Sequence, residues 1–181
     1  DGDTIAFHDL QHDYLVLHAP PLAELHAALV AAYRAVVPAE PSPWWRLPDG
    51  EPYVLDHLVW HLTRVQDDHV ADAFGVPQVW TEYGKRFELP LEPYDTGYGH
   101  RPEQVAQVTV SSPDLLTGYH DAVHEQTIRL VRAVTDADLP RIVDERWDPP
   151  VTLGVRLVSV IDDCAQHVGQ AAFIQGILLR R

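Results

Sequence analysis

Apolar residues recur every three or four positions in four long stretches of the chain. The stretches cover about residues 21–37, 53–74, 113–134 and 155–179. Because this spacing gives a helix one hydrophobic face, each stretch predicts an amphipathic α-helix. A further short helix is expected after Pro102. Four long helices joined by irregular segments predict an all-α chain folded as an antiparallel four-helix bundle with long irregular loops.

Local signals mark where these helices begin and end. Pro38 ends the first predicted helix, and Gly75 and Pro77 end the second. Ser112 is the expected N-cap of the third helix, with Pro113 in its first turn. Two of the connecting segments are longer than inert loops usually are and carry aromatic residues. They therefore either take part in function or cap an end of the bundle.

Size and composition fit one folded domain. With 181 residues, of which 46% are hydrophobic, the chain is expected to form a single domain over residues 1–181, residues 1–20 being an N-terminal extension. The formal net charge of −14 would repel phosphates, which argues against nucleic acid or an anionic membrane as a partner, although such a charge also simply favours solubility. The sequence has no apolar run of the roughly 18 residues that a membrane-spanning helix needs.

Cys164 is the single cysteine of the chain. No internal disulfide can form, which fits a reducing compartment, so we expect a cytoplasmic location. In the fold, Cys164 is expected to be a small buried hydrophobic residue.

Polar residues form three pairs with a spacing of four positions. The pairs are His57/His61, His120/His124 and Asp163/His167. This spacing places both side chains on one helical face, which is how one helix usually offers two ligands to a metal ion. In a chain with 11 histidines such pairs also arise by chance. The pair on the third helix is flanked by Asp121 and Glu125, so we expect it on a solvated face.

Helical phase separates the histidines of the second helix. Leu58 and Leu62 belong to its apolar stripe, and His61 lies at the edge of the stripe, about 60° from Leu58. His57 lies further round and is expected to face solvent. His69 falls on the stripe itself, so we expect it to be buried, either as a hydrogen-bonded core residue or as part of a site.

The last predicted helix carries a polar line beside its apolar stripe. Asp163, His167 and Gln170 form this line, whereas Asp162 is expected to face solvent. A carboxylate and an imidazole that face a bundle interior are costly unless they pair or bind an ion. From spacing alone, both a plain hydrogen bond between Asp163 and His167 and a metal site remain open.

Three segments of the chain resemble the DinB-like superfamily. They are "LVWHLTRVQDDHVADAFG", "GYGHRPEQV" and "RLVSVIDDCAQHVGQAAFIQG". The resemblance is closest to the branch related to mycothiol-dependent enzymes, such as maleylpyruvate isomerase and small-thiol transferases, and it covers the chain from about Trp45 onward. It implies a four-helix bundle that holds one divalent metal ion. Relatives are often dimers, so a homodimer is a further expectation.

The resemblance also implies which residues bind the metal. In this family, one ligand is a histidine on the second helix and two ligands lie four positions apart on the fourth. Carried over, these positions fall on His61, Asp163 and His167, the three residues that helical phase also selects. The first position of the pair is commonly histidine or glutamate in the family, and here it is the shorter Asp163.

Two nitrogen ligands and one oxygen ligand, with open positions left over, are typical of a catalytic Zn²⁺ or Ni²⁺ ion. Such an ion lowers the pKa of a bound water or thiol and so supplies a nucleophile. The resemblance implies a metal-dependent transferase or isomerase that uses a low-molecular-weight thiol, such as mycothiol, on a small-molecule substrate. Two alternatives remain: a non-catalytic, stress-related bundle that binds a metal or ligand, and a dimeric structural bundle.

Further residues are expected near this site, although no catalytic residue can be assigned. Asp68 either orients a ligand histidine or pairs with Arg64, and we prefer the ion pair. Aromatic side chains are expected either to line the mouth of a pocket or to cap the bundle. These are Trp60, Trp80, Tyr98 and His100.

Overall fold

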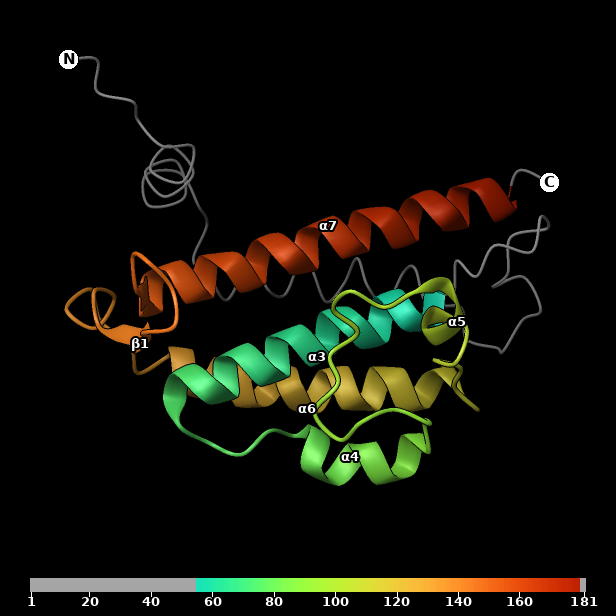
Figure 1. Ribbon diagram of the computed structural model, residues 1–181, viewed down its shortest axis with the longest axis horizontal. Helices are drawn as coiled ribbons and strands as arrows, with labels where there is room; N and C mark the ends of the chain where they lie inside the picture. Colours follow the sequence, from blue (N-terminus) through green and yellow to red (C-terminus); the bar gives the residue numbers. More distant parts are fainter. Residues whose placement is uncertain (1–54, 180–181) are drawn as a thin grey trace, which may run out of the picture.

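The computed structural model describes residues 55–179, and most of this part of the chain is helical. The long helices are α3 (Leu55–Phe74), α6 (Pro113–Val131) and α7 (Leu153–Leu179). α3 packs against both α6 and α7, and the three lie lengthwise along the molecule (Figure 1). The predicted all-α fold is confirmed. The predicted helix over residues 21–37 and the segment 38–52 lie outside the described residues.

The helix boundaries follow local signals in the sequence. The Ser112 hydroxyl accepts a hydrogen bond from the Asp114 backbone N–H at 3.2 Å and so caps α6, as predicted. Gly75 follows the last residue of α3 with a φ of +65°, a left-handed conformation that glycine adopts without strain. α7 begins at Leu153, slightly before the predicted start.

The hydrophobic core lies where α3 faces the other two long helices. α3 contributes Val59, Trp60 and Leu62, α6 contributes Leu116, Tyr119 and Val123, and α7 contributes Val160, Cys164, Ala171 and Ile174. The stripe predicted on the last helix, Val160, Cys164, Val168 and Ala171, therefore faces the core, with Val168 partly buried and the other three buried. Among residues 55–179, no helix combines the length and the apolar character needed to cross a membrane.

A short helix, α4 (Trp80–Phe87), lies within the segment 76–100, where the sequence pattern predicts only an irregular connection. The Asp67 carboxylate of α3 accepts hydrogen bonds from the backbone N–H groups of Val79 and Trp80, at 2.9 and 2.8 Å. Asp67 thus acts as the cap that α4 lacks in its own sequence. Because this cap comes from another helix, no local signal reveals it.

A small antiparallel hairpin precedes α7 and was not predicted. Its strands are β1 (Ile142–Asp144) and β2 (Val151–Thr152). Arg146 and Arg156 each contact the Asp144 carboxylate at 2.9 Å, which ties the hairpin to the start of α7. The short helix expected after Pro102 is α5 (Pro102–Val105).

The predictions for His69, Arg64 and His120 are wrong. His69 is not buried: its side chain is 31% exposed, and Nδ1 lies 3.3 Å from the Asp68 carboxylate, because a polar ring beside a carboxylate and water avoids the cost of burial. Arg64 pairs with Asp67, at 3.6 Å, and not with Asp68, because Asp67 is the acid that shares its buried side of α3. His120 is only 5% exposed, so its predicted solvated face is also incorrect; its ring stacks on that of the second histidine of its pair.

Candidate metal centre

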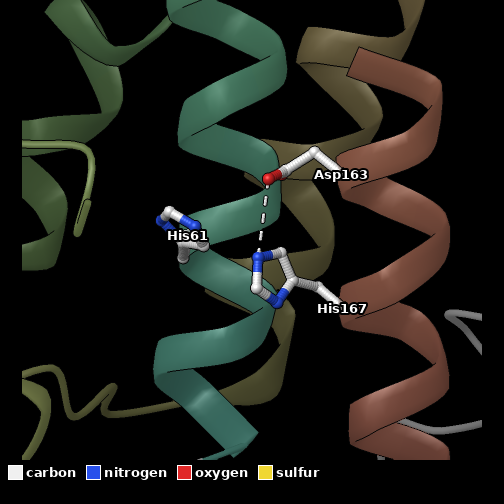
Figure 2. Close-up of side chains that lie close together, drawn as sticks. All are labelled: His61, Asp163 and His167. Atoms are coloured by element: carbon white, nitrogen blue, oxygen red, sulfur yellow. Dashed lines mark ion pairs between the residues drawn. The ribbon is translucent and has the colours of Figure 1, made fainter. Parts of the chain in front are cut away.

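Three side chains from two helices converge between α3 and α7. His61 comes from α3, and Asp163 and His167 come from successive turns of α7 (Figure 2). Each offers one ligand atom such that all three atoms lie within 4.8 Å of one another. The structure thus brings together the three residues that helical phase and the family resemblance both select.

The donor atoms of this cluster are suited to a divalent ion. Asp163 Oδ1 lies 3.6 Å from His167 Nε2, an ion-pair distance that is too long for a hydrogen bond. Asp163 Oδ2 is buried and has no hydrogen-bond partner in the described part of the chain. The two α7 residues therefore do not satisfy each other, and a cation between the three side chains would give this carboxylate a partner. The Asp163 and His167 side chains are 30% and 19% exposed, so a small molecule can reach them.

Hydrogen bonds fix which nitrogen each imidazole offers. The Thr96 carbonyl oxygen contacts His61 Nδ1, and the Gln170 side-chain oxygen contacts His167 Nδ1 at 2.8 Å. Because both oxygens only accept, both Nδ1 atoms carry a proton, and in the neutral rings both Nε2 atoms keep a lone pair. A neutral imidazole whose second nitrogen donates to an oxygen is the usual form of a metal-binding histidine.

Burial and charge shift the pKa values of the two histidines in opposite directions. Burial lowers the pKa of His61 below its usual range, which favours the neutral ring. The neighbouring Asp163 carboxylate raises the pKa of His167. Burial thus favours the neutral form of the His61 ring, whereas the carboxylate favours the protonated form of His167.

His57 is buried beside this cluster, and its predicted exposure to solvent is wrong. Its ring lies nearly parallel to that of His61, with centroids 5.8 Å apart, and its Nε2 lies 3.2 Å from His100 Nδ1. The segment that leads from α4 to α5 covers this side of α3, which helical phase alone cannot show. Burial lowers the pKa of His57 to about 4, so the ring is neutral.

The other residues predicted near the site differ in their surroundings. Trp60 is fully buried beneath the histidines, with its ring centroid 6.1 Å from that of His100, so it does not line a pocket mouth. Tyr98 is 91% exposed. Asp68 accepts a hydrogen bond from Gln78 at 2.7 Å and pairs with His69, which lies outside the cluster. Gln170 holds His167, as described above.

Trp80 lines a cavity of about 390 Å³ between α4 and the segment that follows it. Gln78, Lys85 and Glu92 also line this cavity, and none of the three cluster residues does. Of the aromatic residues predicted to line a pocket, Trp80 therefore does line a cavity, but this cavity is separate from the cluster.

Sequence reasoning missed the backbone contact from Thr96 and the roles of Asp95 and Gly97, described below. All three lie in an irregular segment without periodicity. The nearest signal was the motif "GYGHRPEQV", whose glycines indicate a backbone with special requirements but not which helix it contacts.

Comparison with known proteins places the chain in a family. No curated protein matches it. A solved structure, that of a conserved protein from Enterococcus faecalis, is similar with a TM-score of 0.69 and 25% sequence identity, over 97% of this chain and 98% of that one. The family model described as mycothiol-S-transferase matches residues 40–178. Because that match covers far more than half of the sequence, the chain belongs to the mycothiol-S-transferase family, a DinB-like family.

Proposed function

We propose that this protein is a metal-dependent enzyme that uses a low-molecular-weight thiol, of the mycothiol type, to transfer a group to or isomerise a small molecule. The convergence of His61, Asp163 and His167 carries this proposal. The family match supports the thiol as the co-substrate.

The chain's own residues would hold and orient the ion. The Nε2 atoms of His61 and His167 and a carboxylate oxygen of Asp163 are the ligands, and Thr96 and Gln170 keep the two rings in place. When bound, Zn²⁺ or Ni²⁺ lowers the pKa of a coordinated thiol, which makes a thiolate available near neutral pH. The exposure of Asp163 and His167 leaves a path by which the thiol and its electrophile enter.

Metal analysis of protein purified without a histidine tag tests the site. We expect about one Zn²⁺ or Ni²⁺ per chain, lost in His61→Ala and in His167→Ala. His69→Ala is the matched control, because this partly exposed histidine of α3 lies outside the cluster. Absence of a bound ion after addition of either metal would refute the proposal.

A thiol-consumption assay then separates the enzyme from a non-catalytic binding bundle, which is the second candidate. Small thiols, mycothiol among them, are incubated with electrophiles, and the loss of free thiol is followed with the metal-loaded protein and with His61→Ala. Catalytic loss with the wild type alone supports the enzyme. A metal-loaded protein that is stabilised against heat by a thiol but consumes none supports the binding bundle.

The proposal also covers the cellular location and the oligomeric state of the protein. We propose a cytoplasmic location, since a reducing compartment keeps a small thiol in its active form. Because relatives are often dimers, we also propose a homodimer. Sedimentation or light scattering measures the oligomeric state directly.

A further inference from the structure

The segment of residues 95–100, here called the Asp95–His100 loop, contacts the metal cluster without supplying a ligand. It lies between α4 and α5 and crosses α3 (Figure 1). Its residues His100 and Thr96 contact His57 and His61 of that helix. The Thr96 carbonyl oxygen of this loop is the acceptor for His61 Nδ1.

Asp95 organises the loop through both its side chain and its backbone. Its carboxylate accepts a hydrogen bond from the Gly97 backbone N–H at 2.7 Å and another from His100 Nε2 at 2.9 Å. Its carbonyl oxygen accepts one from Arg64 Nε at 3.0 Å, and Arg64 is itself fully buried in α3. The loop is thereby fastened to the same helix that carries His61.

The hydrogen bonds of this loop determine the tautomer of each histidine in turn. Because the Asp95 carboxylate only accepts, His100 carries a proton on Nε2, and in the neutral ring its Nδ1 accepts. His57 must then donate to His100 from Nε2. His57, held in this way, lies nearly parallel to His61, with the ring centroids 5.8 Å apart.

Gly97 lets the loop approach the histidines closely. Its φ is +87°, and a Cβ atom at this position would lie 3.0 Å from His61 Nδ1, 3.2 Å from His57 Nε2 and 2.9 Å from the ring of Trp60. Real Cβ atoms essentially never come within 3.0 Å of a neighbouring atom, and the buried Trp60 ring has no room to move. Any side chain at position 97 would therefore force the loop or the rings that it meets to shift, and we expect such a shift to disturb the contact between the Thr96 carbonyl and His61.

We propose that the Asp95–His100 loop is a positioning element that holds His61 with its proton on Nδ1, so that Nε2 is the nitrogen offered to the metal ion. The inference rests on the proposed function for its use, but the tautomer that it asserts belongs to the metal-free protein. Asp95, Thr96, Gly97 and His100 act through His61, and none of them is a catalytic residue.

Nitrogen NMR of the metal-free protein tests the tautomer directly. Correlation of the ring nitrogens with the ring carbon-bound protons distinguishes the two tautomers, and His61→Gln identifies the His61 signals. We expect the Nδ1–H form for His61 in the wild type and in Gly99→Ala, and a loss of that preference in Gly97→Ala. Gly99 is the matched control because its φ is +72° but no atom lies within 4 Å of its Cβ position. A wild-type His61 protonated on Nε2, or a Gly97→Ala spectrum like that of the wild type, would overturn the inference.

Zn²⁺ affinity by chelator competition gives the functional readout. Loss of the hydrogen bond that orients a metal-binding histidine typically weakens metal binding about 10- to 100-fold, so we expect a decrease of this size in Zn²⁺ affinity for Gly97→Ala. In Gly99→Ala we expect only the smaller effect of backbone strain on the Zn²⁺ affinity. Equal affinities in these two variants would overturn the inference. If the wild type binds no metal, the proposed function fails, while the tautomer result still decides the role of the loop.

Asp95→Ala serves as a second variant in case Gly97→Ala does not fold. It removes the carboxylate that holds Gly97 and His100 without adding volume. Thermal unfolding establishes that the variant is folded, and the same shift of the His61 tautomer is expected. A folded Asp95→Ala protein that keeps the Nδ1–H form would count against the loop as a positioning element.

Discussion

The buried pair of Arg64 and Asp67 makes a sharp prediction about stability. Both side chains are 0% exposed, and Arg64 N–H lies 3.6 Å from an Asp67 carboxylate oxygen. Asp67 also accepts hydrogen bonds from the Tyr119 hydroxyl at 2.8 Å and from two backbone N–H groups at the start of α4. Asp67→Ala therefore removes the opposite charge from the buried Arg64 guanidinium and leaves the Tyr119 hydroxyl and two backbone N–H groups without their acceptor.

The expected cost follows from these lost partners. Removal of one member of a buried ion pair typically costs about 3–5 kcal/mol, because the remaining charge stays buried. Unsatisfied backbone donors add to this, although neighbouring effects do not sum fully. We expect Asp67→Ala to lower the free energy of unfolding by about 3–5 kcal/mol, a large part of the 5–15 kcal/mol typical of a folded domain.

The neighbouring acid provides the control. The Asp68 side chain is 34% exposed and pairs with the partly exposed His69 and with Gln78, so Asp68→Ala should cost less than about 1 kcal/mol. Urea unfolding of the wild type and both variants, followed by circular dichroism, measures the difference. If Asp67→Ala destabilises the protein by no more than Asp68→Ala, the assignment of α4 capping and charge pairing to Asp67 is wrong.

Two further predictions concern the metal site. Because Asp163 raises the pKa of His167, a proton stays on this ring to a higher pH than usual. The Zn²⁺ affinity, measured by chelator competition, should therefore rise about tenfold per pH unit below the pKa of His167 and level off above it. In the metal-free protein the same shift stabilises the fold at low pH, and this contribution should disappear from urea unfolding curves as the pH rises through the folded-state pKa of His167. Gln170→Ala removes the acceptor for His167 Nδ1 and should weaken Zn²⁺ binding about tenfold, whereas Gln166→Ala, which loses only an exposed contact with Asp162, should leave it unchanged. Equal affinities in the two glutamine variants would show that Gln170 does not orient the ring.

The parts of the fold that could be read from sequence are those that depend on helical period. The apolar stripe of α7, which includes Val160 and Cys164, and the Ser112 cap of α6 each depend on residues of a single helix. Both were predicted correctly. The same reasoning failed at His57, because a loop with no period of its own covers that face. It also failed at α4, whose cap, Asp67, comes from another helix.

The same distinction separates the residues of the candidate site that could be predicted from those that could not. His61, Asp163 and His167 could be chosen because each lies where a helix turns its polar edge toward a neighbour. Thr96 could not, because its carbonyl oxygen is a backbone atom that any residue would supply, and only the path of the chain determines that it lies against His61.

The state of the three cluster residues indicates which of them governs metal affinity. Both imidazoles already have their second nitrogen engaged, one by the Thr96 carbonyl and the other by Gln170, so binding requires little further ordering of either ring. Asp163 is different, since its Oδ2 is buried and has no partner in the described part of the chain. The carboxylate therefore gains the most from an arriving cation, both as charge and as a missing contact. For this reason we propose that the short acid at position 163, where the resemblance implies histidine or glutamate, can serve as a ligand in the proposed metal site between α3 and α7.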